Sequence, residues 1–516
     1  MKIILKFISS LFIIFNISAI ETEKPFVIII PSYNNEEWYS WNLASVFSQN
    51  YSNYRVIYID DRSEDRTYKC VKNYIKKTRN QKRVSLIRNK KRQGALANFY
   101  KAIQSCRPEE IIVCLDGDDW LAHEDALSRL NRIYNKENVW LTYGQCVNWP
   151  QDDFFRCQAL PKEVICAKSY RKHPWVTSHL KTFYAWLFQQ INIEDLFYKN
   201  DFYEMCSDLA MMFPMLEMAG SHSRFIDEIL YVYNICNVNN DFKKNPFLQI
   251  HLEEVIRNRH CYDTLKSFVI VIPSYNNSRW CIYNLNSVFS QTYPVYRVVY
   301  IDDNSTDDTF IKVKKYLNEI DTYHDIFLKK NDERIGALAN HYEAIKRCKD
   351  NEIIVSLDGD DWFSDEFVLK YLNKIYQDPN IWLTYGQFCN WPTGEIGWCE
   401  NYPEKVIKKN EFREFGFVAA QPRTYYGWLA KQIKIEDLFD DKGTFYSVAG
   451  DVALMFPMLE MAGERFKYIP EILTQRNVAT ELNDFKMQPD LQLHTTACIS
   501  KKNKYKRMEG KNTLHS

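Results

Sequence analysis

Residues 111–120 read Ile-Ile-Val-Cys-Leu-Asp-Gly-Asp-Asp-Trp, and this stretch decides how the chain is interpreted. Its first half is a short, continuous apolar run, which is typical of a strand buried in a parallel sheet. Its second half places three carboxylates within four residues, directly where that strand ends. The glycine among them permits a tight turn and the close approach of a ligand. The stretch therefore predicts a buried strand that delivers acidic side chains to one edge of a sheet.

Strand and helix patterns alternate on the N-terminal side of this stretch. The predicted strands are 27–30, 55–59, 84–87 and 111–115, and the predicted helices between them are 38–47, 67–75 and 95–103. This order implies an α/β fold with a mostly parallel sheet and helices on both faces. Ligands of such sheets bind beyond the carboxyl ends of the strands. The polar clusters at 32–34, 60–61 and 116–119 all follow predicted strands, so we expect a binding site there.

The whole pattern occurs twice in the chain. Asp-Gly-Asp-Asp-Trp occurs at 116–120 and again at 358–362, and Pro-Ser-Tyr-Asn-Asn occurs at 31–35 and again at 273–277. A repeat of this length is too long for a solenoid and indicates a duplicated domain. No Pro/Gly/Ser-rich linker separates the copies, which predicts a short tether. The expected organisation is a leader at 1–20, domains at 25–262 and 263–500, and a basic tail at 501–516.

The composition excludes several classes of protein. Hydrophobic residues make up 46% and charged residues 26%, which is typical of globular domains. Basic and acidic residues both number 66, so the chain lacks the overall positive charge of a nucleic-acid binder. The 14 cysteines contain no CxxC pair, which argues against a structural zinc site.

The two ends of the chain carry their own signals. Residues 1–20 begin with Lys2 and Lys6 and continue as an apolar run, which is typical of a secretory signal peptide. An uncleaved membrane anchor is the alternative. Both interpretations predict export through the secretory pathway or membrane association. The Lys-rich tail from Lys501 is expected to be disordered.

The acidic block at 116–119 favours a metal site. Packed carboxylates repel one another, so such a cluster is stabilised when a cation neutralises it. Mg²⁺ and Mn²⁺ prefer these hard oxygen ligands and are often coordinated by protein carboxylates and substrate phosphates together. A solvated Asp-Gly turn is the alternative for one copy alone. The sequence contains no P-loop, no G-x-S-x-G elbow and no HExxH, so NTPase, lipase and zinc-protease readings lack support.

Three motifs carry a resemblance to family 2 glycosyltransferases of the GT-A fold. They are the Pro-Ser-Tyr-Asn-Asn opening, the Asp-Asp-x-Ser-x-Asp segment at 60–65 and 302–307, and the Leu-Asp-Gly-Asp-Asp block. The similarity covers almost all of 25–245 and 267–490. It implies two tandem GT-A domains, each with a Rossmann-like, mostly parallel mixed sheet. It also implies a nucleotide-sugar donor, Mn²⁺ or Mg²⁺ as cofactor, and inversion at the anomeric carbon.

The resemblance assigns roles to residues at matching positions. For nucleotide-sugar binding it implies Pro31, Tyr33 and Asp61 at the nucleobase and Asp116 at the nucleoside, with Pro273, Tyr275, Asp303 and Asp358 in the second copy. For the metal it implies Asp118 with Asp119 close by, and Asp360 with Asp361. Taken without the resemblance, a tyrosine after the first strand suits base stacking or ordinary packing in a loop, and both readings stay open.

The family's inverting chemistry needs a general base. In relatives, this base is an acidic residue at the start of a helix in the second half of the domain. Asp208 and Asp451 stand at that place. An aspartate there also reads as a residue that caps the helix, and the two roles are compatible. Relatives usually have Glu before the Asp, whereas this chain has Ser207 and Gly450. The base assignment therefore departs from the usual family pattern.

Two further positions differ between the copies or stay ambiguous. Lys181 and Arg423 keep a cation, which suits phosphate binding or an exposed surface position equally. His179 becomes Gln421, so that histidine is not a requirement of both sites. The recurring Asn-Asp-Phe at 240–242 and 483–485 is interpreted as part of a lid.

The sequence thus favours an inverting, metal-dependent glycosyltransferase with two modules. The resemblance implies that such an enzyme transfers a sugar from a nucleotide-sugar donor to a hydroxyl of a glycan, glycoprotein or glycolipid. One alternative is a nucleotide-sugar or carbohydrate-binding protein without catalysis, or one active module beside an inactive one. Another is a nucleotidyltransferase, which releases pyrophosphate instead of a nucleoside diphosphate. No nucleic-acid partner is expected.

Overall fold

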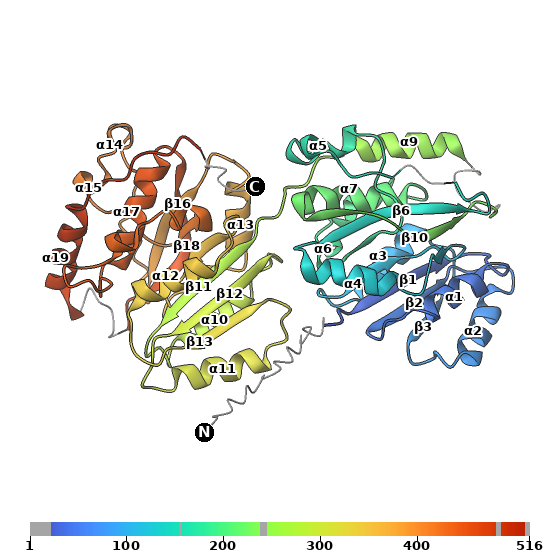
Figure 1. The fold of residues 1–516 in the computed structure, drawn as a ribbon, viewed down its shortest axis with the longest axis horizontal. Helices are drawn as coiled ribbons and strands as arrows, with labels where there is room; N and C mark the ends of the chain where they lie inside the picture. The colour runs from blue at the N-terminus through green and yellow to red at the C-terminus, as the bar shows by residue number, and fades with distance from the viewer. Residues whose placement is uncertain (1–21, 154–156, 238–244, 481–486, 511–516) are drawn as a thin grey trace, which may run out of the picture. The chain divides into compact units, whose positions relative to one another are not determined.

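The computed structural model describes residues 22–153, 157–237, 245–480 and 487–510 (Figure 1). The chain divides into two compact units, Met1–Tyr262 and Asp263–Ser516. The leader at 1–20 and both Asn-Asp-Phe segments lie outside the described residues. None of the helices in the described ranges is long and apolar enough to cross a bilayer.

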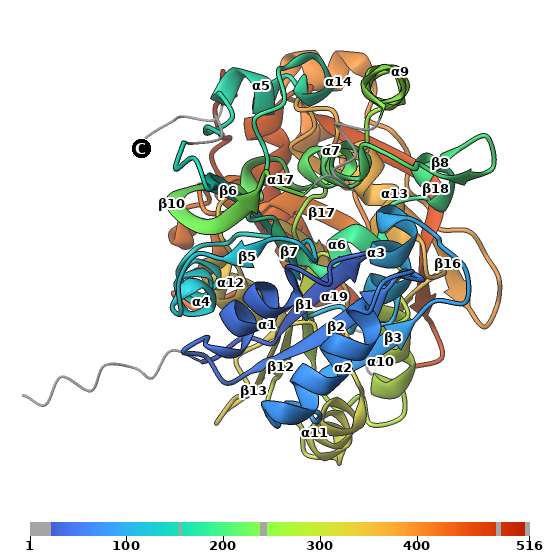
Figure 2. The same ribbon diagram turned by 90° about the vertical axis from the view of Figure 1, so that its right-hand side faces the viewer.

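Unit 1 is built on an eight-stranded mixed sheet with the order β3-β2-β1-β4-β7-β6-β10-β5. Its strands are β1 Phe26–Ser32, β2 Tyr54–Asp60, β3 Val84–Arg88, β4 Ile111–Cys114, β5 Trp120–Leu121, β6 Leu141–Trp149, β7 Thr182–Tyr184 and β10 Ser223–Asn234. In Figure 2, which looks onto unit 1, β3, β2 and β1 follow one another across the sheet. β1 pairs in parallel with β2 and β4, whereas β7 runs antiparallel to β4 and β6. A separate two-stranded sheet joins β8 Phe197–Tyr198 to β9 Asp201–Phe202.

The helices of unit 1 connect these strands. They are α1 Tyr39–Phe47, α2 Thr67–Lys77, α3 Ala95–Gln104, α4 Ala126–Lys136, α5 Lys162–Cys166, α6 Ala185–Gln189, α7 Ser207–Ala219 and α9 Pro246–Arg257. Short 3₁₀ turns lie at η1 Tyr170–Lys172, η2 Ile193–Leu196 and η3 Gly220–His222. Each of the three helices predicted in the first half has a counterpart in α1, α2 and α3.

Unit 2 repeats this plan with the strand order β13-β12-β11-β14-β17-β16-β18-β15. Its strands are β11 Phe268–Ser274, β12 Tyr296–Asp302, β13 Ile326–Lys330, β14 Ile353–Ser356, β15 Trp362–Phe363, β16 Leu383–Trp391, β17 Arg423–Tyr426 and β18 Phe466–Asn477. Its helices are α10 Cys281–Phe289, α11 Thr309–Glu319, α12 Ala337–Arg347, α13 Val368–Ile375, α14 Glu404–Lys409, α15 Phe412–Phe415, α16 Gly427–Ala430, α17 Gly450–Ala462 and α19 Pro489–Ser500, with the 3₁₀ turn η4 Ile435–Leu438.

The central strands are buried on both faces, which explains their continuous apolar runs. Every residue of β1 and of β11 is buried. One face of β11 packs with α10, α11 and α13, and the other packs with α12 and α17. Helices therefore cover both sides of a mostly parallel mixed sheet, as expected where crossover helices connect the strands. The predicted α/β class with two tandem domains of this kind is confirmed.

The first part of the C-terminal tail is folded onto unit 2. The Tyr505 hydroxyl donates to Asp437 Oδ2 at 2.6 Å, and the Met508 amide donates to the Met461 carbonyl at 2.9 Å. Tyr262 makes the same contact with Asp195 in unit 1, also at 2.6 Å. The expectation of disorder is therefore wrong for residues 501–510, because they are the last part of the second repeat and not a solvated end.

Candidate functional site

The acidic block lies in the loop that follows β4, at the carboxyl edge of the sheet. The Asn42 side chain, from α1, donates to the carbonyls of Asp116 and Asp119 at 2.9 and 2.7 Å, which fixes the loop. A Cβ on Gly117 would lie 2.6 Å from Asn35 Nδ2 and 2.7 Å from Ser32 Cβ. The glycine is thus required because the chain itself packs against it, whereas the sequence had suggested room for a ligand. Gly359 is enclosed in the same way in unit 2.

Asp119 is anchored inside the protein and is only 1% exposed. Its carboxylate accepts hydrogen bonds from the Tyr231 hydroxyl at 2.6 Å and from the Asn234 amide at 2.7 Å, both on β10. Burial raises the pKa of Asp119 well above its usual value, and the charges of Asp118 and Asp116 raise it further. Asp119 therefore connects the acidic loop to β10.

Unit 2 shows the same anchoring with one difference. The Asn477 amide donates to Asp361 Oδ1 at 2.7 Å, and the pKa of Asp361 is raised by burial and then by Asp360 and Asp358. Thr474 stands where unit 1 has Tyr231, and its buried hydroxyl has no hydrogen-bond partner within the described residues. The neighbourhood of the acidic block is therefore not identical in the two units.

The acidic block fits a divalent ion that is shared with a substrate. Across the described ranges, no three His, Cys, Asp or Glu side chains are grouped so that they could hold a metal by themselves. Mg²⁺ is commonly held by one or two carboxylates together with substrate phosphates. Burial is the main cause of the raised pKa of Asp119, and repulsion by Asp118 and Asp116 adds to it; a bound cation would relieve that repulsion. The donor set therefore suits Mn²⁺ or Mg²⁺ bound jointly with a diphosphate.

Each predicted base-stacking tyrosine lies under an arginine. The Arg92 guanidinium lies 4.1 Å from the ring centroid of Tyr33, and Arg334 lies 4.0 Å from that of Tyr275. Both tyrosines are half-buried and follow the last residues of β1 or β11. A cation over one ring face leaves the arrangement polar and electropositive, which suits a phosphate-bearing ligand. The sequence analysis missed these arginines, although both stand two residues before the repeated Gly-Ala-Leu-Ala-Asn segment, and this recurrence was a signal that could have found them.

The carboxylate of Asp61 orders the loop before α3. It accepts hydrogen bonds from the Gln93 amide at 2.9 Å, from the Gly94 amide at 2.8 Å and from Asn89 Nδ2 at 2.7 Å. Asp303 does the same in unit 2 with the amides of Ile335 and Gly336. This role within the chain was not predicted, and contact with a nucleobase stays a prediction.

Replacing Asp61 with alanine is expected to destabilise unit 1. Asp61→Ala removes the acceptor for two half-buried backbone amides and one side-chain amide, which costs about 1–3 kcal/mol of unfolding free energy. Urea unfolding followed by circular dichroism measures the change. Glu64→Ala, at an exposed neighbouring position, serves as the control. Equal stability of the two variants would contradict the proposed ordering role.

The candidate base of unit 1 is paired with a buried lysine. Asp208 lies in the first turn of α7, and Lys181 Nζ lies 2.5 Å from its Oδ1. His179 Nε2 lies 4.0 Å from Oδ2. Burial on its own raises the pKa of Asp208, but the charge and hydrogen bond of Lys181 outweigh it and hold that pKa below its usual value. Asp208 is therefore ionised at neutral pH, which is the state that a general base requires.

In unit 2 an arginine links the candidate base to the acidic block. Arg423 Nη1 lies 3.1 Å from Asp451 Oδ2, and its Nη2 lies 3.8 Å from Asp358 Oδ2. Gln421 Nε2 also donates to Asp358. Lys181 and Arg423 are both buried, so the reading of these cations as exposed surface residues is wrong.

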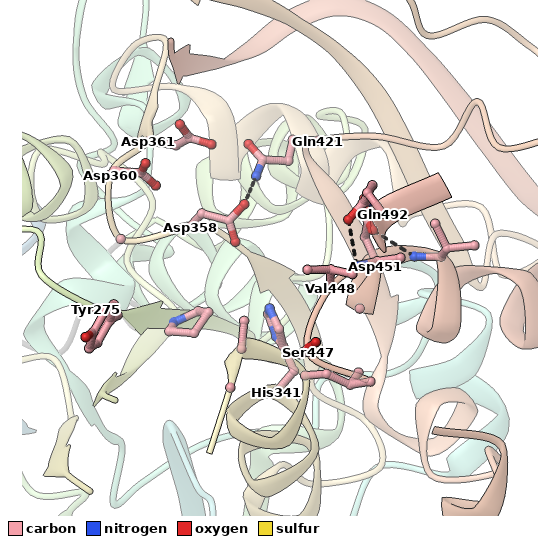
Figure 3. Close-up of a pocket in the computed structure, with 18 of the residues that line it drawn as sticks. Tyr275, His341, Asp358, Asp360, Asp361, Gln421, Ser447, Val448, Asp451 and Gln492 are labelled. Carbon is pink, nitrogen blue, oxygen red and sulfur yellow. Dashed lines mark hydrogen bonds between the residues drawn. The ribbon is translucent and has the colours of Figure 1, made fainter. Parts of the chain in front are cut away.

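Unit 2 encloses a cavity of about 710 Å³ around this arrangement (Figure 3). It brings together every residue predicted for the second copy, namely Pro273, Tyr275, Asp303, Asp358, Asp360, Asp361 and Asp451. Figure 3 shows the acidic residues and Tyr275 on one side of the view and Asp451 on the other. The lining also contains His341 and Gln492, which the sequence analysis did not single out.

Several curated proteins are similar to part of this chain. A Haemophilus influenzae protein named as an uncharacterized glycosyltransferase is 32% identical over 117 residues, which are 23% of this chain and 45% of that protein. The Escherichia coli enzyme named UDP-Glc:alpha-D-GlcNAc-diphosphoundecaprenol beta-1,3-glucosyltransferase WfgD is 31% identical over 118 residues, 23% of this chain and 44% of its own length. The matches thus span less than half the length of either relative.

A solved structure and a family model add to these relatives. The crystal structure of S. aureus TarS in complex with UDP-GlcNAc aligns with a TM-score of 0.35 at 16% identity, covering 45% of this chain and 65% of that chain. The family model described as glycosyl transferase family 2 matches residues 27–197 and 269–434, which together are more than half of the chain. The chain therefore belongs to glycosyl transferase family 2, and each copy of the repeat carries a match to the family.

Proposed function

We propose that each unit is an inverting, metal-dependent glycosyltransferase that moves a sugar from a nucleotide-sugar to a hydroxyl acceptor. The observation that supports this most is the cavity of unit 2, where the acidic block and Asp451 line the same space. A nucleotide-sugar presents a diphosphate, a sugar and a base, and the lining offers a group for each. The donor class is the one named for the E. coli relative, which uses UDP-glucose.

The residues divide the work of an in-line displacement. Tyr275 and Asp303 hold the nucleobase of the donor, and Asp358, the first residue of the acidic block, holds the nucleoside. Asp360 would hold a divalent ion, which would supply positive charge for the departing diphosphate. Asp451 takes the proton of the acceptor hydroxyl, whose oxygen attacks the anomeric carbon from the face opposite the diphosphate. In unit 1 the corresponding groups are Asp61, Asp116, Asp118 and Asp208 with Tyr33.

The acceptor and the cellular location belong to the same proposal. A glycan, glycoprotein or glycolipid hydroxyl is the proposed acceptor, and the curated relatives named above include an enzyme whose acceptor is a lipid-linked sugar. The apolar leader at 1–20 supports export or membrane association of the chain. Both parts are open to direct test with the full-length protein.

A donor screen tests the proposed activity. Purified full-length protein is incubated with UDP- and GDP-sugars and simple sugar acceptors, and nucleoside diphosphate release is measured with Mn²⁺, with Mg²⁺ and with a chelator. We expect release that depends on the metal and is lost in the Asp118→Ala, Asp360→Ala double variant. The two single variants assign the activity to one unit or to both.

Three results of this screen contradict the proposal. Unchanged turnover in the double variant or in chelator would remove the metal site. Release of pyrophosphate would instead indicate a nucleotidyltransferase. Tight binding of a nucleotide-sugar without turnover, with every acceptor tried, would indicate a binding protein.

A further inference from the structure

One buried histidine lines the cavity of unit 2 without being used by the proposed chemistry. His341 lies in α12 and is 7% exposed. Its Nδ1 is buried and has no hydrogen-bond partner within the described residues. Figure 3 shows its ring rising from the helix toward Asp358 and into the space that the cavity residues surround. Buried polar atoms are rarely left unpaired, so this ring is a candidate contact for a ligand.

The ring is neutral at physiological pH. Burial lowers the pKa of His341 to about 4, while Asp358 acts to raise it and Arg423 acts to lower it further. A neutral imidazole offers one hydrogen-bond donor and one acceptor. Sugar hydroxyls need this combination, because each can donate and accept at the same time. A phosphate would instead favour a cation.

Unit 1 lacks this group at the matching position. Phe99 stands there and is buried. Unit 1 has a different buried histidine, His179, which comes from the segment before β7 and stacks on Tyr231 with ring centroids 4.4 Å apart. The same place in unit 2 is taken by Gln421, which bonds to Asp358. The two units therefore offer different polar groups around a shared set of carboxylates.

The position of His341 indicates which part of a substrate it meets. The transferred sugar must lie between the diphosphate at the acidic block and the proposed general base, Asp451, which activates the acceptor hydroxyl. In Figure 3, His341 lies between Tyr275, the proposed nucleobase contact, and Asp451, the proposed general base. It also lies close enough to Asp358 and Arg423 for both charges to act on its ring.

We propose that His341 hydrogen-bonds a hydroxyl of the sugar carried by the donor in unit 2, a contact that unit 1 cannot make, so that the two units select different sugars. The inference rests on the proposed function of the site. A site that pairs its polar groups with a substrate hydroxyl discriminates strongly against sugars that lack the hydroxyl in that position. The proposal thus predicts two donor specificities within one chain.

The test separates the sugar from the nucleotide. Full-length protein carrying Asp118→Ala, which removes the proposed metal ligand of unit 1 and so weakens donor binding there, is titrated in Mn²⁺ with UDP, GDP and a panel of their sugar conjugates. His341→Phe installs the residue of unit 1. We expect it to weaken binding of the preferred nucleotide-sugar by about tenfold, the loss of roughly one hydrogen bond, and to leave the free nucleoside diphosphate unchanged.

A second variant guards against misfolding and tests the chemistry. His341→Gln keeps a donor and an acceptor, and we expect it to retain more of the nucleotide-sugar affinity than His341→Phe does. Thermal unfolding of both variants shows whether unit 2 is intact. Equal weakening of nucleotide and nucleotide-sugar, or no weakening of either, overturns the inference while the proposed function stands. Failure of the unaltered chain to bind any of these ligands overturns the proposed function itself.

Discussion

Asp208→Asn combined with Asp451→Asn is expected to lower the rate of sugar transfer by roughly 10²–10⁴-fold while the donor still binds. Asparagine keeps the shape of the side chain but does not accept the proton of the acceptor hydroxyl. Both aspartates lie in the first turn of a long buried helix, α7 or α17, where the position is fixed by the core. The loss should therefore appear in kcat and not in donor affinity.

The structure indicates which of the two substitutions disturbs protein stability less. Asp208→Asn removes the negative charge that lies 2.5 Å from Lys181 Nζ, and this lysine is buried. Arg423 keeps Asp358, at 3.8 Å, in Asp451→Asn. Leaving a buried cation without its close partner is costly, so we expect the Asp208 variant to be the less stable of the two.

Donor affinity and turnover are measured separately on each variant. Titration with the donor in Mn²⁺ gives the affinity, and nucleoside diphosphate release under saturating donor gives the rate. Asp263→Asn, at an exposed position, is the matched control and should change neither quantity. A collapse of donor affinity with the rate constant preserved would show that these aspartates bind or cap and do not act as bases.

The first half of each fold was predictable because its strands are continuous apolar runs. The run at 27–30 corresponds to β1, which is buried on both faces, and the same holds for the runs that became β2 and β4. The strand β7 was not predictable. It has three residues and sits antiparallel between β4 and β6, so long-range pairing and not local pattern determines it.

The candidate site divides in the same way. Carboxylates at strand ends are visible in a sequence, because their position follows from the order of the elements, and those of the second copy line one cavity. The partners of those carboxylates include Arg423 on β17 and Asn477 on β18, which were left ambiguous or missed. His341 gave no signal either, because a single histidine in a helix has no counterpart in the first copy.

A second large effect is expected at the buried ion pair that holds α7. Arg171 Nε lies 2.6 Å from Glu217 Oε1, and Arg171 Nη2 lies 3.0 Å from Oε2. The two side chains are 6% and 0% exposed. Glu217→Leu leaves a buried guanidinium without its carboxylate, so we expect unit 1 to lose about 3–5 kcal/mol of unfolding free energy.

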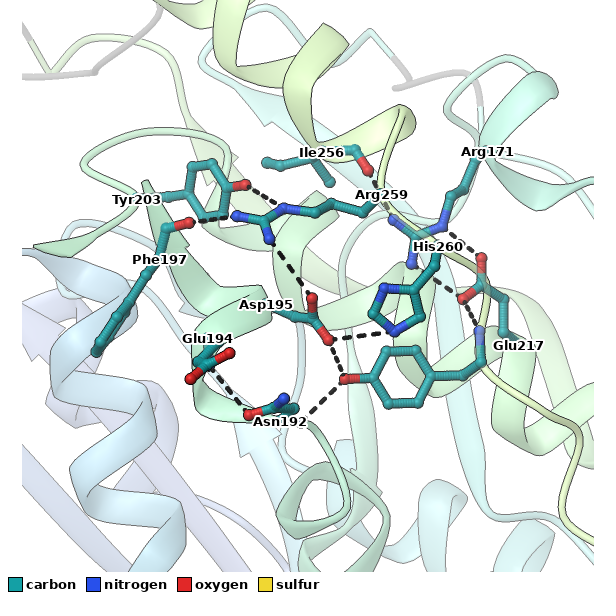
Figure 4. Close-up of polar contacts among 11 residues, drawn as sticks. Arg171, Asn192, Glu194, Asp195, Phe197, Tyr203, Glu217, Ile256, Arg259 and His260 are labelled. Atoms are coloured by element: carbon teal, nitrogen blue, oxygen red, sulfur yellow. Dashed lines mark hydrogen bonds and ion pairs between the residues drawn. The ribbon is translucent and has the colours of Figure 1, made fainter. Parts of the chain in front are cut away.

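The ion pair is tied to the end of the unit through main-chain groups (Figure 4). Arg171 Nη1 donates to the Ile256 carbonyl at 2.6 Å, near the end of α9, and the Tyr262 amide donates to Glu217 Oε2 at 3.0 Å. Removing the carboxylate therefore loosens α7, α9 and the chain that leaves unit 1. Because Asp208 lies in the first turn of α7, loss of this anchor also reaches the candidate base.

Unit 2 offers an independent repetition of the experiment. Arg413 Nε lies 2.6 Å from Glu460 Oε1, its Nη1 donates to the Ile499 carbonyl at 2.6 Å, and the Tyr505 amide donates to Glu460 Oε2 at 2.9 Å. Glu460→Leu is therefore expected to destabilise unit 2 as Glu217→Leu destabilises unit 1. A loss confined to one unit would show that the contact geometry alone does not set the effect.

Removing both charges distinguishes the cost of an unpaired charge from the worth of the pair. Arg171→Met with Glu217→Leu should recover much of the stability, because no buried charge remains. Recovery should stay incomplete, since the Ile256 carbonyl and the Tyr262 amide lose their partners.

Urea unfolding measures the stability of all variants. Glu137→Leu is the control, because Glu137 forms an exposed 3.5 Å pair with Arg224, and its loss should change stability by less than about 1 kcal/mol. If Glu217→Leu unfolds like this control, the buried pair does not hold α7, and the placement of Asp208 must depend on the apolar packing of the helix alone.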